Sequence, residues 1–392
     1  MIPLAYVTAK RLSSSRGGLI AAALTAVSPW LIWYSQEARS YALFALLSLA
    51  SFVFFVHALE SPRPTNLVGW AATSALALAS HYFAVFMVVP EALWLLTQCD
   101  VRRHAVIAVA CVGAVGAALL PLALEQAHGI KGKAGFLQTP LSSRITNIPT
   151  RFLLGEAAPS GSKTLLAALA LVFVLTGVGL LWRAGDVAQS KHLWRALSVG
   201  VVAVLIPILM ALFGRDYLDA RNLIGAWVPL VIILAAGYAA VRPVALVAAA
   251  CLAALFLVLV IVSATDEALE RTDYRAVARA LGPSPGPGQR AIVVSPEFNW
   301  TPLTYYLPKY PQLSPGSVGI REIDLIGWAS QTLPKEAADA LRRRGFNIAE
   351  DRVAQKLRLV RLTATRVTSV SRSELVRSRL GTGSATVLIQ TR

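Results

Sequence analysis

The chain has 392 residues, of which 56% are hydrophobic and only 15% are charged, and its mean hydropathy is +0.59. Soluble domains carry about 25% charged residues, so this composition excludes an ordinary soluble protein and predicts a polytopic membrane protein. The net charge of +16 would also suit a nucleic-acid-binding protein. Its basic residues are scattered between apolar stretches, however, so we expect them to anchor the cytoplasmic side and contact anionic membrane lipids, with no nucleic-acid partner.

Apolar stretches follow one another through the first two thirds of the chain. Met1–Ala9 is apolar but too short for a bilayer crossing, which needs about 20 residues, so we expect it to be the end of a helix that begins before this sequence. The predicted fold is mainly α, a polytopic helix bundle of about nine spans within residues 1–263. The expected spans are residues 17–34, 40–58, 65–81, 82–98, 104–124, 163–182, 193–213, 222–240 and 243–263.

Basic residues alternate between the connections of these spans and predict the orientation of the bundle. By the positive-inside rule, the basic connections lie on the cytoplasmic side. They contain Lys10, Arg11, Arg16, Arg63, Arg102, Arg103, Arg183, Lys191, Arg195 and Arg242. The turns near residues 36–39, 81 and 214–221 hold fewer basic residues, so we expect them, and everything after about residue 264, on the outer side.

A connection of about 38 residues, 125–162, is also expected on the outer side, and its length indicates a functional loop. It carries Lys131 and Lys133 as well as Arg144 and Arg151, but long loops count less in the positive-inside rule. Residues 142–157 predict a short interfacial helix, on which Arg144 and Arg151, seven residues apart, share a face. This helix is either a plain amphipathic surface helix or one that helps to hold a lipid phosphate.

Residues 264–392 predict a small extracytoplasmic α/β domain. A charged amphipathic helix begins near Asp266 and a Gly- and Pro-rich break follows at residue 282. Further helices are expected at residues 302–307 and 333–344, and strands at 291–295, 356–362 and 385–391.

The stretch from Ser28 to Leu43 is an unusually polar turn between two membrane helices. On a helix that starts near Gln36, Glu37 and Tyr41 would share a face, and Arg39 would reach towards a neighbouring loop. A carboxylate and a guanidinium at the outer end of the bundle could bind a phosphorylated lipid and its sugar. The alternative is a structural Glu–Arg pair that closes a helical hairpin.

Two other outer turns carry candidate residues. His81 and Tyr82 lie at the first, where a structural histidine is the simpler interpretation. Arg215 and Arg221 flank two aspartates at the second, and arginine binds phosphate bidentately. The alternative there is a solvated turn with internal Arg–Asp pairs. Glu91 lies within an apolar stretch, where an ionisable side chain needs a partner and can face the bundle interior.

Several segments together resemble the polytopic GT-C glycosyltransferases related to the aminoarabinose and protein-mannosyl transferases. The motif Ser28-Pro-Trp-Leu-Ile-Trp-Tyr-Ser-Gln-Glu-Ala-Arg-Ser-Tyr is the most specific. Ser80-His-Tyr-Phe-Ala-Val-Phe, the Arg215-Asp-Tyr…Ala-Arg-Asn-Leu-Ile-Gly-Ala-Trp-Val-Pro-Leu segment and Asp273-Tyr-Arg-Ala-Val-Ala-Arg-Ala-Leu are weaker matches. The resemblance extends over about residues 1–310.

The resemblance implies a bacterial-type plasma-membrane enzyme that moves a hexosyl or pentosyl group from a polyprenyl-phosphate carrier to a lipid, glycan or protein acceptor by inverting displacement. A carboxylate would act as base, and basic residues would stabilise the leaving lipid phosphate. The family places its main acidic residue in a loop before the second helix, which this sequence does not include. The catalytic residue is therefore unknown, and we expect an incomplete chain or a degenerate homologue.

The residues expected to bind substrate are those of the outer turns and of the interfacial helix. They are Glu37, Arg39, Tyr41, His81, Tyr82, Arg144, Arg151, Arg215 and Arg221. The sequence identifies no cofactor. Cys99, Cys111 and Cys251 indicate neither disulfides nor a metal site. Whether the reaction uses a divalent metal is left open. The second hypothesis is a non-catalytic membrane protein, either a lipid-linked-sugar transporter or flippase or a scaffold for cell-envelope synthesis.

Overall fold

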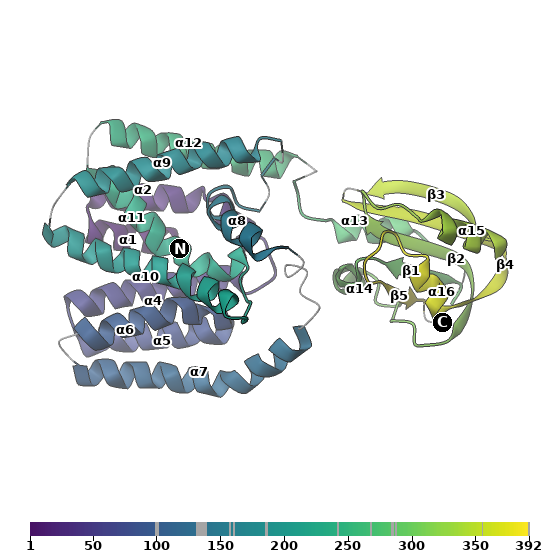
Figure 1. Cartoon of the computed structure of the whole chain (residues 1–392), viewed down its shortest axis with the longest axis horizontal. Helices are drawn as coiled ribbons and strands as arrows, with labels where there is room; N and C mark the ends of the chain where they lie inside the picture. Colours follow the sequence, from purple (N-terminus) through teal and green to yellow (C-terminus); the bar gives the residue numbers. More distant parts are fainter. Residues whose placement is uncertain are drawn as a thin grey trace. The chain divides into compact units, whose positions relative to one another are not determined.

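The computed structural model of the chain describes residues 1–390 except 99–101, 131–138, 157, 160, 185–186, 241–242, 267–268, 284–285, 287 and 355. The chain divides into two compact units, Met1–Thr265 and Asp266–Arg392 (Figure 1). Cys99, Lys131, Lys133 and Arg242, which the sequence analysis singled out, lie outside the described residues.

The first unit is a bundle of helices (Figure 1). Its elements are α1 (Ile2–Leu12), α2 (Ser15–Ala26), α3 (Pro29–Ser35), α4 (Tyr41–Glu60), α5 (Pro64–Ser80), the 3-10 helix η1 (Tyr82–Ala84), α6 (Val85–Gln98), α7 (Arg102–Ile130), α8 (Leu141–Leu154), α9 (Lys163–Ala184), α10 (Val187–Leu212), the 3-10 helix η3 (Ala220–Ala226), α11 (Trp227–Ala240) and α12 (Val244–Thr265).

Within the described ranges, six helical segments are long and apolar enough to cross a membrane, and seven if the bent pair α2–α3 counts as one span. Two of the six are the complete helices α4 and α12, and three are the greater parts of α7, of α9 and of α10. The sixth is the continuous segment formed by η3 and α11. The predicted spans 65–81 and 82–98 are also helical, as α5 and α6, but these helices have only 17 and 14 residues. The structure thus supports the helical bundle and six or seven of the nine predicted spans.

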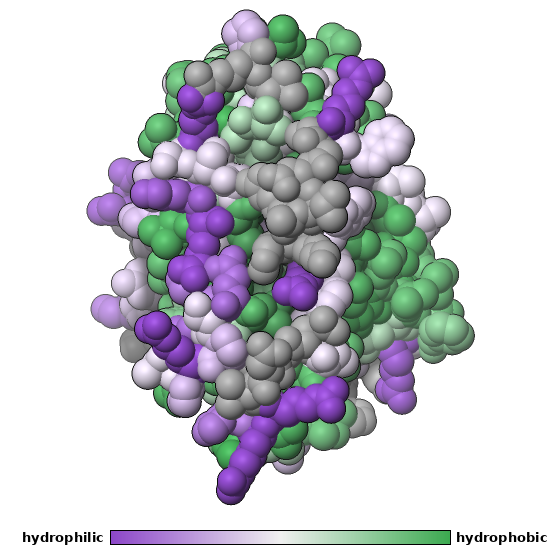
Figure 2. Space-filling view, turned by 90° about the vertical axis from the view of Figure 1, so that its left-hand side faces the viewer, coloured by the Kyte–Doolittle hydropathy of each residue, from purple (hydrophilic) through white to green (hydrophobic). Residues whose placement is uncertain are grey.

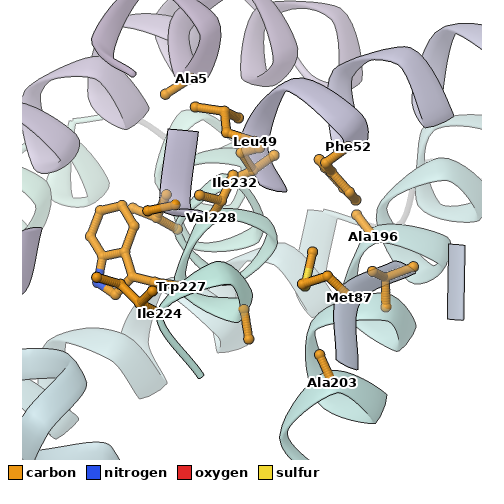
Figure 3. Close-up of a cluster of buried hydrophobic side chains, with 14 of the residues drawn as sticks. Ala5, Leu49, Phe52, Met87, Ala196, Ala203, Ile224, Trp227, Val228 and Ile232 are labelled. Atoms are coloured by element: carbon orange, nitrogen blue, oxygen red, sulfur yellow. The ribbon is translucent and has the colours of Figure 1, made fainter. Parts of the chain in front are cut away.

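The core of the bundle surrounds α11, which is buried along most of its length. Figure 3 shows part of this core, in which Ala5 of α1 and Leu49 of α4 lie near Ile232 of α11, while Met87 of α6 lies near Ala203 of α10. Figure 2 views the bundle from the end away from α8, where hydrophilic side chains gather. Arg11 and Glu60 form an ion pair between the ends of α1 and α4.

The second unit contains one five-stranded sheet with the strand order β3-β4-β2-β1-β5. Strands β1 and β2 are parallel, and the other neighbouring pairs are antiparallel. The strands are β1 (Arg290–Val294), β2 (Ser317–Trp328), β3 (Asn347–Ala354), β4 (Leu357–Ser371) and β5 (Thr386–Ile389). The helices are α13 (Tyr274–Leu281), the 3-10 helix η4 (Glu297–Asn299), α14 (Trp300–Tyr306), α15 (Lys335–Arg343) and α16 (Arg372–Arg377). Apolar clusters cover both faces of the sheet.

A network of buried charges crosses this sheet. Arg290 on β1 is 1% exposed, and its Nε lies 2.5 Å from Glu322 and 3.1 Å from Asp324 on β2. Arg361 on β4 donates to Asp324 at 2.8 Å and pairs with Glu350 on β3 at 3.3 Å. Two guanidinium groups therefore face three carboxylates, and the burial of Asp324 itself raises its pKa to about 7.

This pKa predicts that the second unit loses stability as the pH rises. The raised pKa means that the folded state binds a proton that an unfolded aspartate, with a pKa of about 4, releases. The resulting stability is complete below pH 4 and is lost as the pH rises through 7. We expect the opening free energy of β1 and β2 to fall by on the order of 3 kcal/mol over this range.

Hydrogen exchange of the β1 and β2 amides, corrected for intrinsic rates, measures this free energy in the whole protein in detergent. The control is Asp324→Asn, which cannot titrate at this position and should lack this component of the pH dependence. Equal pH dependence in both proteins would show that Asp324 is not the titrating group.

Two helix boundaries differ from those that the sequence predicts. Helix α7 continues to Ile130, into the predicted loop 125–162, and α13 begins at Tyr274 and not near Asp266, because Asp273 caps it by accepting from the amide of Ala276 at 2.8 Å. Strands β2 and β3 lie where no strand is predicted. The predicted helices at 142–157, 302–307 and 333–344 and the strand at 291–295 are confirmed, each within a few residues.

Candidate functional site

The bend between α2 and α3 places the first aromatic residues of the site. The two helices meet at 52°. Pro29 is the first residue of α3, and it disfavours a helical backbone at Ser28, whose hydroxyl accepts from the amide of Leu31 at 3.3 Å. Trp30 and Tyr34 on α3 are consequently buried, with their rings 5.2 Å apart.

The turn between α3 and α4 holds Glu37 and Arg39. No helix starts near Gln36, because α3 ends at Ser35 and α4 begins at Tyr41, so the predicted common helical face of Glu37 and Tyr41 is wrong. Arg39 instead lies 3.4 Å from Glu37, with its side chain 60% exposed. A pair this exposed contributes at most about 1 kcal/mol, so Arg39 is easily released from its carboxylate.

A row of rings connects this turn to the end of α5. The ring of Tyr41 lies 4.9 Å from that of Tyr34 and 5.1 Å from that of His81. His81 also stacks on Phe44 at 4.9 Å, and its Nδ1 accepts from the amide of Phe83 at 3.4 Å. The structure therefore brings Tyr41 and His81 together. Tyr82, in η1, is half-buried beside them.

Helix α8 is tied to the connection between α10 and η3 through Arg144. Its guanidinium makes two hydrogen bonds to the carboxylate of Asp216, one of them 2.8 Å long, and a third to the carbonyl oxygen of Leu218 at 2.7 Å. The Arg144 side chain is 10% exposed. Its hydrogen bonds hold the pKa of Asp216 below the ordinary value, so this pair stays charged at neutral pH.

We predict that Arg144→Gln loosens the connection between α10 and η3. The substitution removes at least four hydrogen bonds, including one from Nε to the carbonyl oxygen of Thr139 at 3.1 Å, and leaves Asp216 without its cation. This change costs about 1–3 kcal/mol. Hydrogen exchange at the Leu218 amide, which donates to Asp216 at 3.2 Å, reports the change. The matched control is Arg39→Gln, whose exposed pair predicts no measurable change there. Equal exchange in the two variants would contradict this role of Arg144.

The second arginine of α8 reaches a different carboxylate. Arg151 pairs with Glu156, which also accepts from the hydroxyl of Tyr34 at 2.8 Å. Gly155, between α8 and Glu156, has a φ of 75° and lies against the backbone of Pro29, where a Cβ atom would come within 3.1 Å. A glycine is therefore needed for this close approach. It fixes Glu156 beside α3.

Arg221 is the second residue of η3. Its Nε is 3.0 Å from Asp219, which also caps η3 by accepting from the Arg221 amide at 3.2 Å. Arg221 is also within electrostatic range of Tyr34, Tyr41 and Glu37. Arg215, in contrast, is exposed and forms no ion pair within the described ranges.

These residues form one site, which we call the arginine cluster. It consists of Arg39, Arg144, Arg151 and Arg221 with their carboxylates Glu37, Asp216, Glu156 and Asp219. The cluster has four cations and four anions, so its net charge is zero. A phosphate would bind there by replacing a carboxylate on a guanidinium, since both anions suit the same bidentate geometry.

Part of this site was missing from the sequence prediction. The two aspartates were visible between Arg215 and Arg221, but the partner of Asp216 is Arg144, 72 residues away. Glu156 carried no motif of its own. The contacts of Tyr34 with Trp30, Tyr41 and Glu156 could not be predicted, because they depend on the bend between α2 and α3.

Glu91 lies away from the arginine cluster. It is completely buried and accepts hydrogen bonds from Trp70 at 2.8 Å and from Ser51 at 3.0 Å. These contacts join α4, α5 and α6, so Glu91 faces the interior and has a structural role. Within the described residues, no group of three or more His, Cys, Asp or Glu side chains is arranged to hold a metal ion.

One family model matches the first part of the chain. Residues 1–124 match the model of the dolichyl-phosphate-mannose-protein mannosyltransferase family. No curated protein matches the chain significantly. The matched range is less than half of the chain, and it includes the turn with Glu37 and Arg39 as well as His81. This part of the chain is similar to membrane glycosyltransferases of the GT-C type. Arg144, Arg151, Arg215 and Arg221 lie outside it.

Proposed function

We propose that the protein transfers a sugar from a polyprenyl-phosphate carrier to an acceptor outside the cytoplasm, and that the arginine cluster binds the carrier phosphate. The family match supports the reaction class and a lipid-linked sugar as donor. The observation that carries the site assignment is that α8 contacts two other segments through its arginines. Arg144 pairs with Asp216 before η3, and Arg151 pairs with Glu156, which also accepts from Tyr34 on α3. Hydrogen bonds and ion pairs thereby link residues of three separate segments.

The phosphate would enter by exchange with a carboxylate. Arg39 and Arg215 are the most accessible cations, since one has a weak exposed pair and the other has none in the described part of the chain. They suit the first contact with an approaching anion. Arg221, with its side chain 33% exposed, would then turn from Asp219 to the phosphate. Arg144 and Arg151 hold α8 in place during this step.

The chemical step would be an inverting displacement. The acceptor atom attacks the anomeric carbon, the bond from that carbon to the phosphate oxygen breaks, and the phosphate leaves with the electron pair. A base takes the proton of the acceptor. Arg221 would stabilise the charge that develops on the leaving phosphate. The base is not assigned, because Glu37, Glu156, Asp216 and Asp219 are each paired with an arginine.

The same proposal includes the orientation of the bundle. The basic connections would face the cytoplasm, and the arginine cluster and residues 266–392 the other side. The transferred group would be a hexose or pentose and the acceptor a lipid, a glycan or a protein. The bacterial-type plasma membrane would be its location.

A non-catalytic membrane protein is the second candidate, and one observation favours it. Arg144, Arg151 and Arg221 already have carboxylate partners, so the cluster is electrostatically complete without a ligand. A scaffold, or a transporter that carries a lipid-linked sugar, needs no base. This candidate predicts that the sugar remains attached to its carrier.

Native mass spectrometry of the detergent-purified protein with a short polyprenyl phosphate tests the binding site. We expect the wild type to retain the lipid and Arg221→Gln to lose it. The matched control is Arg342→Gln on α15, an exposed arginine that also pairs with an aspartate, Asp339, at 3.5 Å. If Arg221→Gln retained the lipid at the wild-type level, the arginine cluster would not be the binding site of the carrier phosphate.

A further inference from the structure

The second unit exposes a stripe of aromatic side chains on one side of η4 and α14. Phe298 is 61% exposed, Tyr305 83% and Tyr306 42%. Thr301 lies between them and is also exposed. Residues 298–306 contain no charged side chain, although Glu297 and Lys309 lie close by on either side. We call Phe298, Tyr305 and Tyr306 the aromatic stripe.

The other side of the same helical segment explains why the stripe faces outward. Asn299 and Leu303 are fully buried, and Leu307 is nearly so. They recur at intervals of four residues, which is one face of a helix. Leu303 and Leu307 pack into the apolar cluster between α13 and the sheet. The segment is thus held by one face. On the aromatic stripe, the ring of Phe298 lies 6.1 Å from that of Trp328, and the rings of Tyr305 and Tyr306 lie 5.2 Å apart, yet all three side chains stay exposed.

The connection to the last membrane helix limits where the stripe can lie. Helix α12 ends at Thr265, and α13 begins at Tyr274. The eight intervening residues reach at most about 28 Å when fully extended. Helix α14 packs on α13, and the hydroxyl of Tyr274 donates to Asn299 at 2.8 Å. The stripe therefore belongs to an element that is fastened directly to the first helix after the membrane.

We propose that the aromatic stripe docks on the lipid–water interface of the membrane. Tyrosine is enriched at this interface because its ring is apolar and its hydroxyl can stay in water. An uncharged helix surface with three exposed rings meets this requirement. The contact would limit the motion of the second unit on its short connection. This function is independent of the proposed sugar transfer.

Fluorescence quenching in the full-length protein tests this proposal. Cys99, Cys111 and Cys251 are first replaced by alanine, and Tyr305→Cys is labelled with the environment-sensitive dye NBD. The control label is at Val367→Cys on β4, which is 52% exposed in the same unit. The protein is reconstituted in phosphatidylcholine vesicles, and quenching is measured with nitroxide-labelled lipid and with aqueous iodide.

We expect the label at position 305 to be quenched several-fold more by the nitroxide lipid than the label at position 367, and less by iodide. Adding Phe298→Glu should lower the lipid quenching at position 305, because the new carboxylate opposes insertion. Equal lipid quenching at the two positions, or no effect of Phe298→Glu, would overturn the proposal. Protection from iodide by added maltodextrin without any lipid quenching would also overturn it, in favour of a carbohydrate surface.

Discussion

Arg221→Gln should lower sugar transfer about 100-fold or more, because it removes a cation that we place beside the leaving phosphate. The change should leave the fold intact, since Asp219 still accepts from the backbone amide at position 221 and still caps η3. Transfer is measured as the release of a radiolabelled sugar from its polyprenyl-phosphate carrier. Arg221→Lys should retain part of the activity, since it keeps the charge but loses the bidentate geometry.

Arg215→Gln should also abolish transfer, because we assign this exposed arginine to the first contact with the carrier. The two variants need one common control, and Arg342→Gln provides it, since this arginine is remote from the bundle in sequence and belongs to the second unit. Full activity in both Arg215→Gln and Arg221→Gln would exclude this end of the bundle as the phosphate site.

Arg290→Met should destabilise the second unit by about 3–5 kcal/mol. The substitution leaves Glu322 and Asp324 buried with only Arg361 as a cation. It also removes the donors to the carbonyl oxygens of Leu281 and Pro283, which lie 2.9 Å and 2.7 Å from the guanidinium. The end of α13 would therefore lose its hydrogen bonds to β1, while Arg361 on β4 would still donate to the carbonyl oxygen of Leu281 at 2.6 Å.

Hydrogen exchange of the β1 and β2 amides in the full-length protein measures this loss. Arg342→Met is the matched control, because its side chain is 66% exposed and an exposed change of this kind is worth about 0.5 kcal/mol or less. If the two variants opened equally, the buried network would contribute no more than a surface pair.

The parts of the fold that depend on continuous apolar stretches could be predicted from the sequence. Helices such as α4, α9 and α12 are apolar over their whole length, so composition alone reveals them. Strand β2 could not be recognised, because Glu322 and Asp324 interrupt its apolar residues. These carboxylates are buried only because Arg290 and Arg361 on neighbouring strands neutralise them.

The candidate site shows the same limit. Short motifs mark Arg39, His81 and Arg221 as residues of turns, and the structure does bring Tyr41, His81 and Arg221 near one another. Which carboxylate pairs with which arginine depends on contacts between distant segments, as between Arg144 and Asp216. The helix expected from Gln36 fails for a local reason, because the chain makes a turn there before α4 begins at Tyr41.

Sugar transfer by membranes that contain the protein tests the central claim most directly. The substrate is a polyprenyl phosphate that carries a radiolabelled sugar, supplied with extracted cell-envelope acceptors. Our account predicts that the label moves to an acceptor, that free polyprenyl phosphate appears in equal amount, and that Arg221→Gln stops both. If the labelled sugar stays on its carrier, whether or not the carrier crosses the bilayer, the protein is not the transferase that we propose.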